Sequence, residues 1–204
     1  MSPGRRSETD TAELRASLVQ AALRVVEREG PAGLTTRALA AEAGCAVGLP
    51  YKVFADRSDL VGEMIAAEFA RIRAEMESIV SAAGSRTVGS NLARWALVLL
   101  RTPAIALANE DDPHGRIRAA TEAAAGRTGI VPAIESTVVA YLAAEKELGR
   151  VARHVDERAF GFLVAGAVHN LLVSGEAYPR PSRRGLERML ASVADALSPR
   201  NEKS

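Results

Sequence analysis

Residues 34–60 gather the side chains of this chain that are best suited to bind a polyanion. The stretch reads LTTRALAAEAGCAVGLPYKVFADRSDL, with hydroxyl groups at Thr36 and Tyr51 and cations at Arg37, Lys52 and Arg57. A guanidinium can donate two parallel hydrogen bonds to a guanine, and cationic side chains neutralise phosphates. We therefore expect Arg37 to read a base, and Lys52 and Arg57 to contact phosphates of a nucleic acid.

The same stretch has the pattern of two short helices joined by a tight turn. Thr35 is suited to cap the first helix, which we expect over residues 36–43. Gly44 permits the left-handed backbone that a sharp turn needs. The second helix, expected over residues 47–54, is about two turns long and suits a major groove roughly 12 Å wide. The spacing therefore predicts a helix-turn-helix.

Pro50 conflicts with a second helix that begins at residue 47. There it removes a backbone hydrogen bond and crowds the preceding turn. A start one or two residues later places Pro50 in the first turn, where proline is tolerated. Both starts stay open. Val47 or Leu49 can contact thymine methyl groups, so the sequence predicts an unusually apolar reading of the bases.

Helical periodicity extends over the rest of the chain. Apolar residues from Leu14 to Val26 recur on one face of a preceding helix, and residues 58–82 form one long helix. Further helices are expected at residues 88–108, 113–125, 131–148, 156–174 and 183–197. Alternating, strand-like runs are absent from the sequence. We predict an all-α fold with a three-helix domain of residues 1–57, whose first nine residues are a disordered arm, and a six-helix domain of residues 58–204.

The composition is that of an ordinary globular protein, with 48% hydrophobic and 25% charged residues. The sequence has no run of about 18 apolar residues and no apolar segment of a secretory signal near Met1. We therefore expect a cytoplasmic protein with no membrane partner. Cys45 is the only cysteine, which excludes an internal disulfide.

The helix-turn-helix stretch resembles the TetR family of transcriptional regulators. The resemblance lies in TTRALAAEAG at residues 35–44, in the G-x-x-Y-x-x-F spacing that begins at Gly48, and in the acidic-Leu pair that ends at Leu60. It is specific over residues 14–60, whereas only the number and lengths of the helices match over residues 61–204. The family's fold implies an N-terminal DNA-binding domain and a C-terminal domain for effector binding and dimerisation.

The resemblance also carries over individual positions that face DNA. Thr36 and Arg37 lie at the start of the second helix. Gly48, Tyr51 and Lys52 lie in the third, or recognition, helix, and Arg57 lies at the start of the fourth. With Val47 and Leu49, they complete the set of residues that we expect at DNA. The partner implied is a double-stranded, palindromic operator.

Three features favour a different class, a protein-interaction module that kept the fold and lost DNA affinity. The first 60 residues carry eight Lys/Arg and eight Asp/Glu, whereas a DNA-binding domain is commonly basic. Ala46 stands where the family usually has a Ser or Thr cap, and Pro50 interrupts the recognition helix. A salt-dependent DNA shift separates this alternative from a regulator.

Two C-terminal helices carry broad apolar stripes. The helix over residues 156–174 is apolar nearly all round, and the helix over residues 183–197 has a single stripe. The resemblance implies that they pair with a second copy in a homodimer, through Phe160, Leu163, Val164, Ala167, Leu171, Leu186, Met189, Leu190 and Val193. A dimer holds two recognition helices one DNA turn, roughly 34 Å, apart. The alternative is that both helices complete the core of a monomer.

The resemblance further implies that the helix over residues 88–108 lines a pocket for a small-molecule effector. The candidate lining residues are Trp95, Leu99, His114, Tyr141, His169 and Asn170. An ordinary core or surface role competes for each of them, and a hydrogen-bonded core histidine is the competing interpretation of His169. The implied function is that of a repressor released from its operator by the effector.

An all-helical enzyme is the remaining alternative. His114, His154 and His169 match no metal-binding spacing, and the sequence has neither a glycine-rich phosphate loop nor a G-x-S-x-G motif. We therefore expect no catalysis, no metal and no cofactor.

Overall fold

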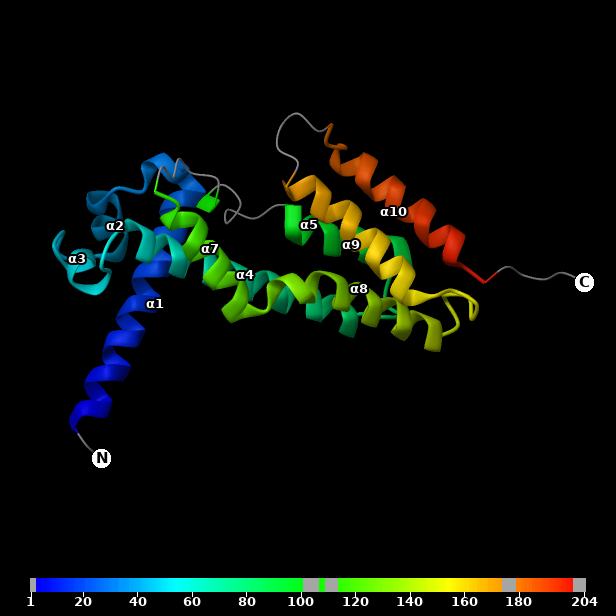
Figure 1. Cartoon of the computed structure of the whole chain (residues 1–204), viewed down its shortest axis with the longest axis horizontal. Coiled ribbons are helices and arrows are strands. Elements are labelled where there is room, and N and C mark those ends of the chain that lie inside the picture. Colours follow the sequence, from blue (N-terminus) through cyan, green and yellow to red (C-terminus); the bar gives the residue numbers. More distant parts are fainter. Residues whose placement is uncertain (1–2, 101–106, 109–113, 174–178, 200–204) are drawn as a thin grey trace, which may run out of the picture. The chain divides into compact units, whose positions relative to one another are not determined.

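A computed structural model describes residues 3–100, 107–108, 114–173 and 179–199, and these residues form helices, turns and no strand (Figure 1). The helices are α1 (Pro3–Glu29), the 3-10 helix η1 (Pro31–Gly33), α2 (Thr36–Ala43), α3 (Leu49–Val53), α4 (Arg57–Ser81), α5 (Val88–Leu100), α7 (Arg116–Thr128), α8 (Ile130–Glu147), α9 (Glu157–Val173) and α10 (Arg183–Leu197). The predicted all-α fold is confirmed. None of these helices combines the length and the apolar character of a membrane-spanning segment.

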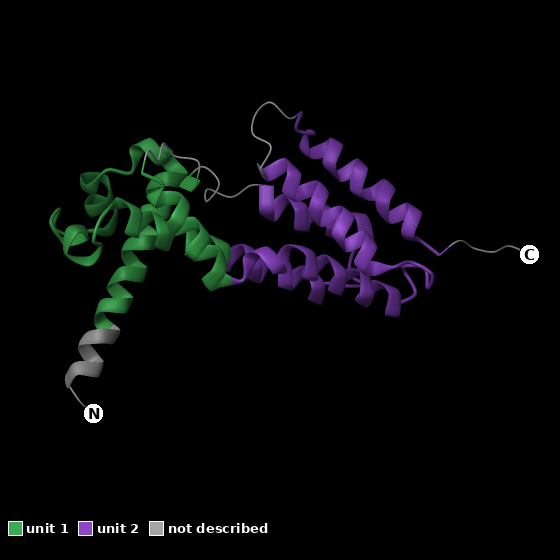
Figure 2. Cartoon of the chain, viewed as in Figure 1, with its two compact units in different colours: residues 1–69, 103–128 green, residues 70–102, 129–204 purple. Residues whose placement is uncertain are grey.

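The chain forms two compact units (Figure 2). The first comprises residues 1–69 and 103–128, and the second comprises residues 70–102 and 129–204. Helix α4 contributes to both units, and the chain passes between them three times. The units therefore differ from the expected ranges 1–57 and 58–204, which stay a prediction about functional domains.

Helix α1 begins at Pro3, whereas the sequence analysis expects a disordered arm over residues 1–9. Proline is favoured in a first helical turn, because its missing N–H has no partner there in any case. The sequence then holds no glycine or proline between Gly4 and Gly30. The helix therefore extends toward the N-terminus beyond its apolar stripe, and it ends at Glu29, directly before Gly30, whose φ is 74°.

The core of the first unit joins α1, the helix-turn-helix, the first part of α4, and α7. Buried side chains of α1, such as Leu18 and Val25, share this core with Met64 of α4 and Ile117 of α7. Each such side chain contributes roughly 1.5–3 kcal/mol when it leaves water. Helix α7 packs so closely that a Cβ on Gly62 of α4 would lie 3.0 Å from the Cβ of Ala120.

The second unit is built from two close helix pairs, α8 with α9 and α5 with α10. Small residues permit each approach: a Cβ on Gly161 would meet Val139 at 2.4 Å, and one on Gly89 would meet the Ala191 backbone at 2.7 Å. Tyr141 donates a hydrogen bond of 2.6 Å to Glu145, whose side chain is fully buried. Burial, and then the bond to Glu145, raise the pKa of Tyr141.

Candidate nucleic-acid interface

The first turn of α2 begins with a side-chain cap and continues with two predicted DNA contacts. Thr35 has an extended backbone, and its hydroxyl oxygen accepts a hydrogen bond of 3.1 Å from the N–H of Ala38. The predicted cap is therefore confirmed. Thr36 follows half-buried and Arg37 exposed, so the guanidinium of Arg37 is accessible at the start of the helix.

The turn after α2 depends on one glycine, and it explains how Pro50 is accommodated. Gly44 lies in the left-handed region, with φ 64° and ψ 33°, as the sequence predicts. Helix α3 begins at Leu49, so the later of the two predicted starts is the one observed and Pro50 falls in the first turn. The cap position is Gly48, with no side-chain cap bond. The N-terminus of α3 therefore has no side-chain cap, from Ala46 or from any other residue.

The exposed side of the turn and of α3 mixes apolar, aromatic and cationic side chains. Val47 is 50% exposed and Tyr51 is 72% exposed. Gly48 and Lys52 are also exposed, whereas Leu49 is half-buried. The outward-facing surface therefore offers an apolar side chain, Val47, an aromatic one, Tyr51, and a cationic one, Lys52.

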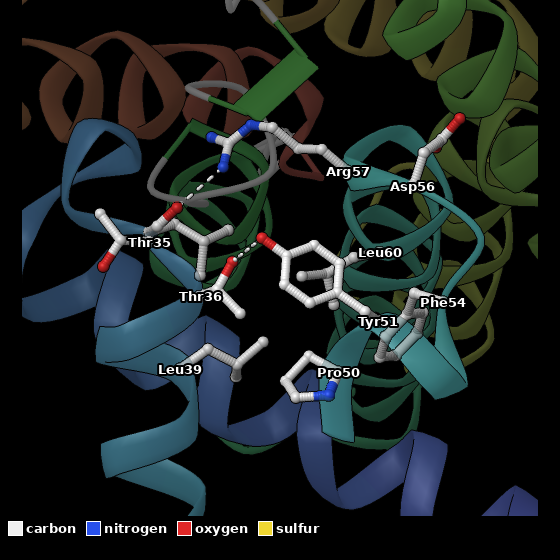
Figure 3. Close-up of a pocket in the computed structure, with 10 residues that line it drawn as sticks. Thr35, Thr36, Leu39, Pro50, Tyr51, Phe54, Asp56, Arg57 and Leu60 are labelled. Atoms are coloured by element: carbon white, nitrogen blue, oxygen red, sulfur yellow. Dashed lines mark hydrogen bonds between the residues drawn. The ribbon is translucent and has the colours of Figure 1, made fainter. Parts of the chain in front are cut away.

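Three of the predicted contact residues line one concavity of about 380 Å³ (Figure 3). The hydroxyl of Thr36 donates to the hydroxyl oxygen of Tyr51 at 2.8 Å, which joins α2 to α3. Arg57 donates to the backbone oxygen of Leu34 at 2.8 Å and to that of Pro31 at 3.4 Å. The guanidinium of Arg57 therefore fixes the segment before α2, and its expected phosphate contact stays a prediction.

The start of α4 is tied both to its own cap and to α7. The carboxylate of Asp56 accepts from the N–H of Asp59 at 2.9 Å, and this bond lowers the pKa of Asp56. Arg116 of α7 lies 3.4 Å from the same carboxylate, and Arg127 lies 3.4 Å from Glu63. Within the first unit, α7 is therefore attached to the helix that directly follows the recognition helix.

The segment from α1 to α4 that holds this geometry also matches a known family. Residues 18–64 fit the sequence model of the tetR family of bacterial regulatory proteins. This helix-turn-helix segment is thus similar to the DNA-binding segment of those regulators. No curated protein matches the chain.

Solved structures extend the tetR likeness from this segment to the whole fold. A candidate TetR-family transcriptional regulator from Mesorhizobium loti is 19% identical, with a TM-score of 0.62 over 92% of this chain and 96% of its own. One from Rhodococcus sp. is 20% identical, with a TM-score of 0.52 over 92% and 100%. The transcriptional regulator FadR from Bacillus subtilis, solved with stearoyl-CoA, is 16% identical, with a TM-score of 0.50 over 90% and 97%. The chain thus has the tetR fold, with a helix-turn-helix domain followed by a helical domain.

The residues expected to line an effector pocket divide between buried and exposed positions of this fold, and the pocket itself stays a prediction. Trp95 and Tyr141 are buried in the second unit, and the indole N–H of Trp95 donates to Thr137 at 2.9 Å. Leu99 is buried as well. His114 belongs to the first unit and is exposed, and His169 and Asn170 are exposed on α9. The interpretation of His169 as a core histidine is therefore wrong, because α9 packs on α8 through a different face.

The residues expected at the dimer interface, in contrast, are brought together. All nine line one groove of about 390 Å³ between α9 and α10, together with Asn170, Pro179 and Pro181. Leu163 is 61% exposed there and Met189 is 60% exposed. The chain therefore presents a continuous apolar groove, and its occupation by a second copy stays a prediction.

One polar cluster beside the recognition helix has no counterpart in the sequence analysis. Arg15 of α1 donates to the backbone oxygen of Val53 and pairs with Asp59 of α4 at 3.0 Å. These partners lie 38 and 44 residues away along the chain. No local spacing relates them, so only the folded arrangement identifies the cluster.

Proposed function

We propose that this chain is a homodimeric transcriptional repressor that binds a palindromic operator and leaves it when a small-molecule effector binds. The observation that carries the proposal is the surface of α2 and α3, where Arg37, Tyr51 and Lys52 are all exposed. Such side chains can donate hydrogen bonds to phosphates and to base edges. The tetR match of residues 18–64 supports the same reading.

The polar groups divide into base-reading and phosphate-binding roles. Arg37 is suited to donate two bonds to a guanine, and Lys52 to neutralise a phosphate. A hydroxyl both donates and accepts, so Tyr51 can accept from Thr36 and still donate its proton to a phosphate oxygen. Val47 is suited to contact a thymine methyl group, since its side chain is half exposed and apolar.

The α9–α10 groove supports the dimer. An interface around a two-fold axis uses the same surface on both copies, so one apolar groove per chain is sufficient. Burial of side chains such as Leu163 and Met189 removes apolar area that the single chain leaves in water. The second copy also supplies the second recognition helix that a palindrome requires.

Release by an effector requires the second unit to influence the first. The chain passes between the units within α4 and again on either side of the segment that contains α7. Helix α7 in turn pairs with Asp56 and Glu63 near the recognition helix. An effector that favours another disposition of α4 or α7 can weaken operator binding by its differential affinity for the two states, typically 1–3 kcal/mol.

The DNA part of the proposal is tested by fluorescence anisotropy with labelled duplex from the region upstream of this protein's gene, at several salt concentrations. We expect saturable binding that exceeds binding to a scrambled duplex by roughly a thousandfold, with a steep dependence on salt. If neither duplex is preferred, selection from a random DNA pool finds the operator. Failure to bind any pool member contradicts the proposal and favours the protein-interaction module.

The effector part needs a separate readout, which the only tryptophan provides. Trp95 lies in α5 and bonds to Thr137 in α8, so a ligand that enters between these helices changes its emission. Stearoyl-CoA, the ligand in the FadR structure, is the first probe. A compound that changes Trp95 emission and weakens operator binding supports release. One that binds and leaves operator affinity unchanged contradicts it.

A further inference from the structure

We propose that Arg15 is a positioning residue for the recognition helix, which it holds from α1 without touching DNA. The inference rests on the proposed DNA binding of α2 and α3. It concerns a residue outside the helix-turn-helix itself, at a site where the sequence predicts no function.

The guanidinium of Arg15 joins three elements of the first unit. One terminal nitrogen donates to the backbone oxygen of Val53, the last residue of α3. The other donates to the carboxylate of Asp59 in α4 at 3.0 Å. The guanidinium carbon lies 4.6 Å from the ring centre of Phe54, the C-cap residue that directly follows α3. The second oxygen of Asp59 accepts from the N–H of Ala55 at 3.0 Å, so the whole turn after α3 is bonded to one ion pair.

Helix α3 needs such support because little within it fixes its position. It is five residues long, lacks a side-chain cap and contains Pro50, which has no N–H to donate. Helices of this length do not persist by themselves. The carbonyl groups at a helix C-terminus lack partners within the helix and carry partial negative charge. A cation that donates a hydrogen bond to one of these carbonyl oxygens, as Arg15 does to that of Val53, therefore stabilises the end of α3.

The surroundings of Arg15 also argue that it does not bind phosphate itself. Its side chain is 32% exposed, and both terminal nitrogens are bonded to protein oxygens. The carboxylate of Asp59 beside it cancels its charge and repels a phosphate at that point. Arg15 therefore acts on DNA through α3: it fixes the position of this helix and, with it, of the exposed Tyr51 and Lys52.

Arginine, rather than lysine, is required by the geometry. Two bonds to different partners and a cation over the ring of Phe54 suit the fixed fork of a guanidinium, whereas an ammonium is a single point charge. Arg15→Lys keeps the charge and most of the side-chain packing, so the fold persists. We expect it to weaken operator binding about tenfold, since charge-assisted bonds that fix α3 are lost.

The experiment measures operator affinity against salt for the full-length chain and for Arg15→Lys. We expect the loss of affinity with an unchanged salt slope, because no phosphate contact disappears. Lys52→Ala, in contrast, lowers the slope by about one. Arg24→Lys is the matched control: Arg24 lies on the same helix and bonds to Glu42 of α2 at 2.7 Å, and no described hydrogen bond or ion pair joins it to α3 or α4. It should stay within about twofold of the original affinity.

A spectroscopic readout reports on the position of α3 without DNA. The chain is labelled with 3-fluorotyrosine, and the fluorine resonance of Tyr51 is assigned with Tyr51→Phe. Arg15→Lys should shift or broaden the Tyr51 resonance and leave that of Tyr141, which is buried in the second unit, in place. Asp59→Asn should change the Tyr51 resonance in the same way. The double variant should lose no more operator affinity than the more affected of the two single variants, because both act through one ion pair.

Two results overturn the inference. A salt slope that falls by about one in Arg15→Lys means that Arg15 itself contacts phosphate. A Tyr51 resonance and an affinity that match those of Arg24→Lys mean that Arg15 does not position α3. If the original chain binds no DNA at all, the proposed function fails, while the resonance of Tyr51 still decides whether Arg15 holds the helix.

Discussion

The surface of α2 and α3 and the groove of α9 and α10 differ in what they leave unsatisfied. On the first surface, Thr36 bonds to Tyr51, and Arg57 bonds to backbone oxygens of the same unit. In the groove, apolar side chains such as Leu163 and Met189 are more than half exposed to water. One surface is fixed before it binds anything, whereas the other gains free energy only when it is covered.

This difference suggests how the two surfaces are used. A preorganised polar surface loses little entropy on binding and can bind and release a charged partner as conditions change. An apolar groove of this kind favours a lasting partner, because the hydrophobic effect acts whenever the groove is exposed. We therefore expect the groove to hold a second copy permanently and the helix-turn-helix to bind DNA reversibly. The predictions that follow test this contrast, starting with the largest effect.

The groove is most easily disrupted by a charge at a large apolar side chain that is well exposed in the single chain. Leu163→Glu places two carboxylates in a symmetric interface, and burying an unpaired charge costs several kcal/mol. Because Leu163 is 61% exposed in the single chain, the fold of the monomer is retained. We expect a monomer in analytical ultracentrifugation and a loss of operator affinity of at least about 100-fold, since only one recognition helix remains per molecule.

Val131→Glu provides the matched control, because Val131 of α8 is also 61% exposed and lies outside the groove. It should remain a dimer with full operator affinity. A Leu163→Glu chain that stays dimeric would mean that copies associate through another surface, and the groove would then need another occupant.

The helix-turn-helix surface should lose affinity in two distinguishable ways. Arg37→Ala removes the proposed guanine contact, which should cost about 1–3 kcal/mol on the preferred operator and relax the choice of base at one position. Lys52→Ala should weaken binding equally for all sequences. Anisotropy titrations with the operator and with single-base variants separate the two effects. Equal losses on every duplex for Arg37→Ala would assign it a phosphate contact instead.

The buried contact between α5 and α8 should affect stability and leave DNA binding unchanged. Thr137→Val keeps the shape of the side chain but leaves the buried N–H of Trp95 without its acceptor. An unsatisfied buried donor costs about 1–3 kcal/mol, so the free energy of unfolding should fall by that amount. Urea titration followed by Trp95 emission measures it. Ser136→Ala, at an exposed neighbouring position, is the control; an equal loss there would show that the bond contributes nothing.

Local patterns were sufficient to predict the helix-turn-helix, and the structure shows why. The cap at Thr35, the turn at Gly44 and the contact residues lie within one continuous stretch, where a few residues determine the backbone. The start of α3 was left open between two positions, and the later one, which suits Pro50, is observed. For the groove, each helix carries its own apolar stripe, and the family resemblance implied that the two stripes lie side by side.

The candidate effector pocket could not be predicted in the same way. Its proposed members come from helices far apart in the sequence, and helical periodicity does not say which of two apolar faces of α9 packs on α8. His169 and Asn170 therefore turned out exposed, whereas Trp95 and Tyr141 are buried. Arg15 was missed for the same physical reason, because its partners are brought near only by the packing of α1 against α4.

The smallest expected effect concerns the ion pairs that join α1 to α2. Arg24, and then Arg28, hold the pKa of the Glu42 carboxyl below its ordinary value. The folded pKa is thus lower than the unfolded one, so the stabilisation is present above the ordinary carboxyl range and is lost as the pH falls through the folded value. Glu42→Gln should therefore lower stability slightly at neutral pH and flatten the loss of stability in acid.

This effect should also shrink in salt, because the arginine side chains are more than half exposed and mobile ions screen their charge. Unfolding free energies of the original chain and of Glu42→Gln, measured from neutral to acidic pH at two salt concentrations, test both statements. If the unfolding free energies of the two chains changed with pH in parallel, the ionisation of Glu42 would not contribute to the loss of stability in acid. That result would leave the apolar core as the attachment of α2 to α1.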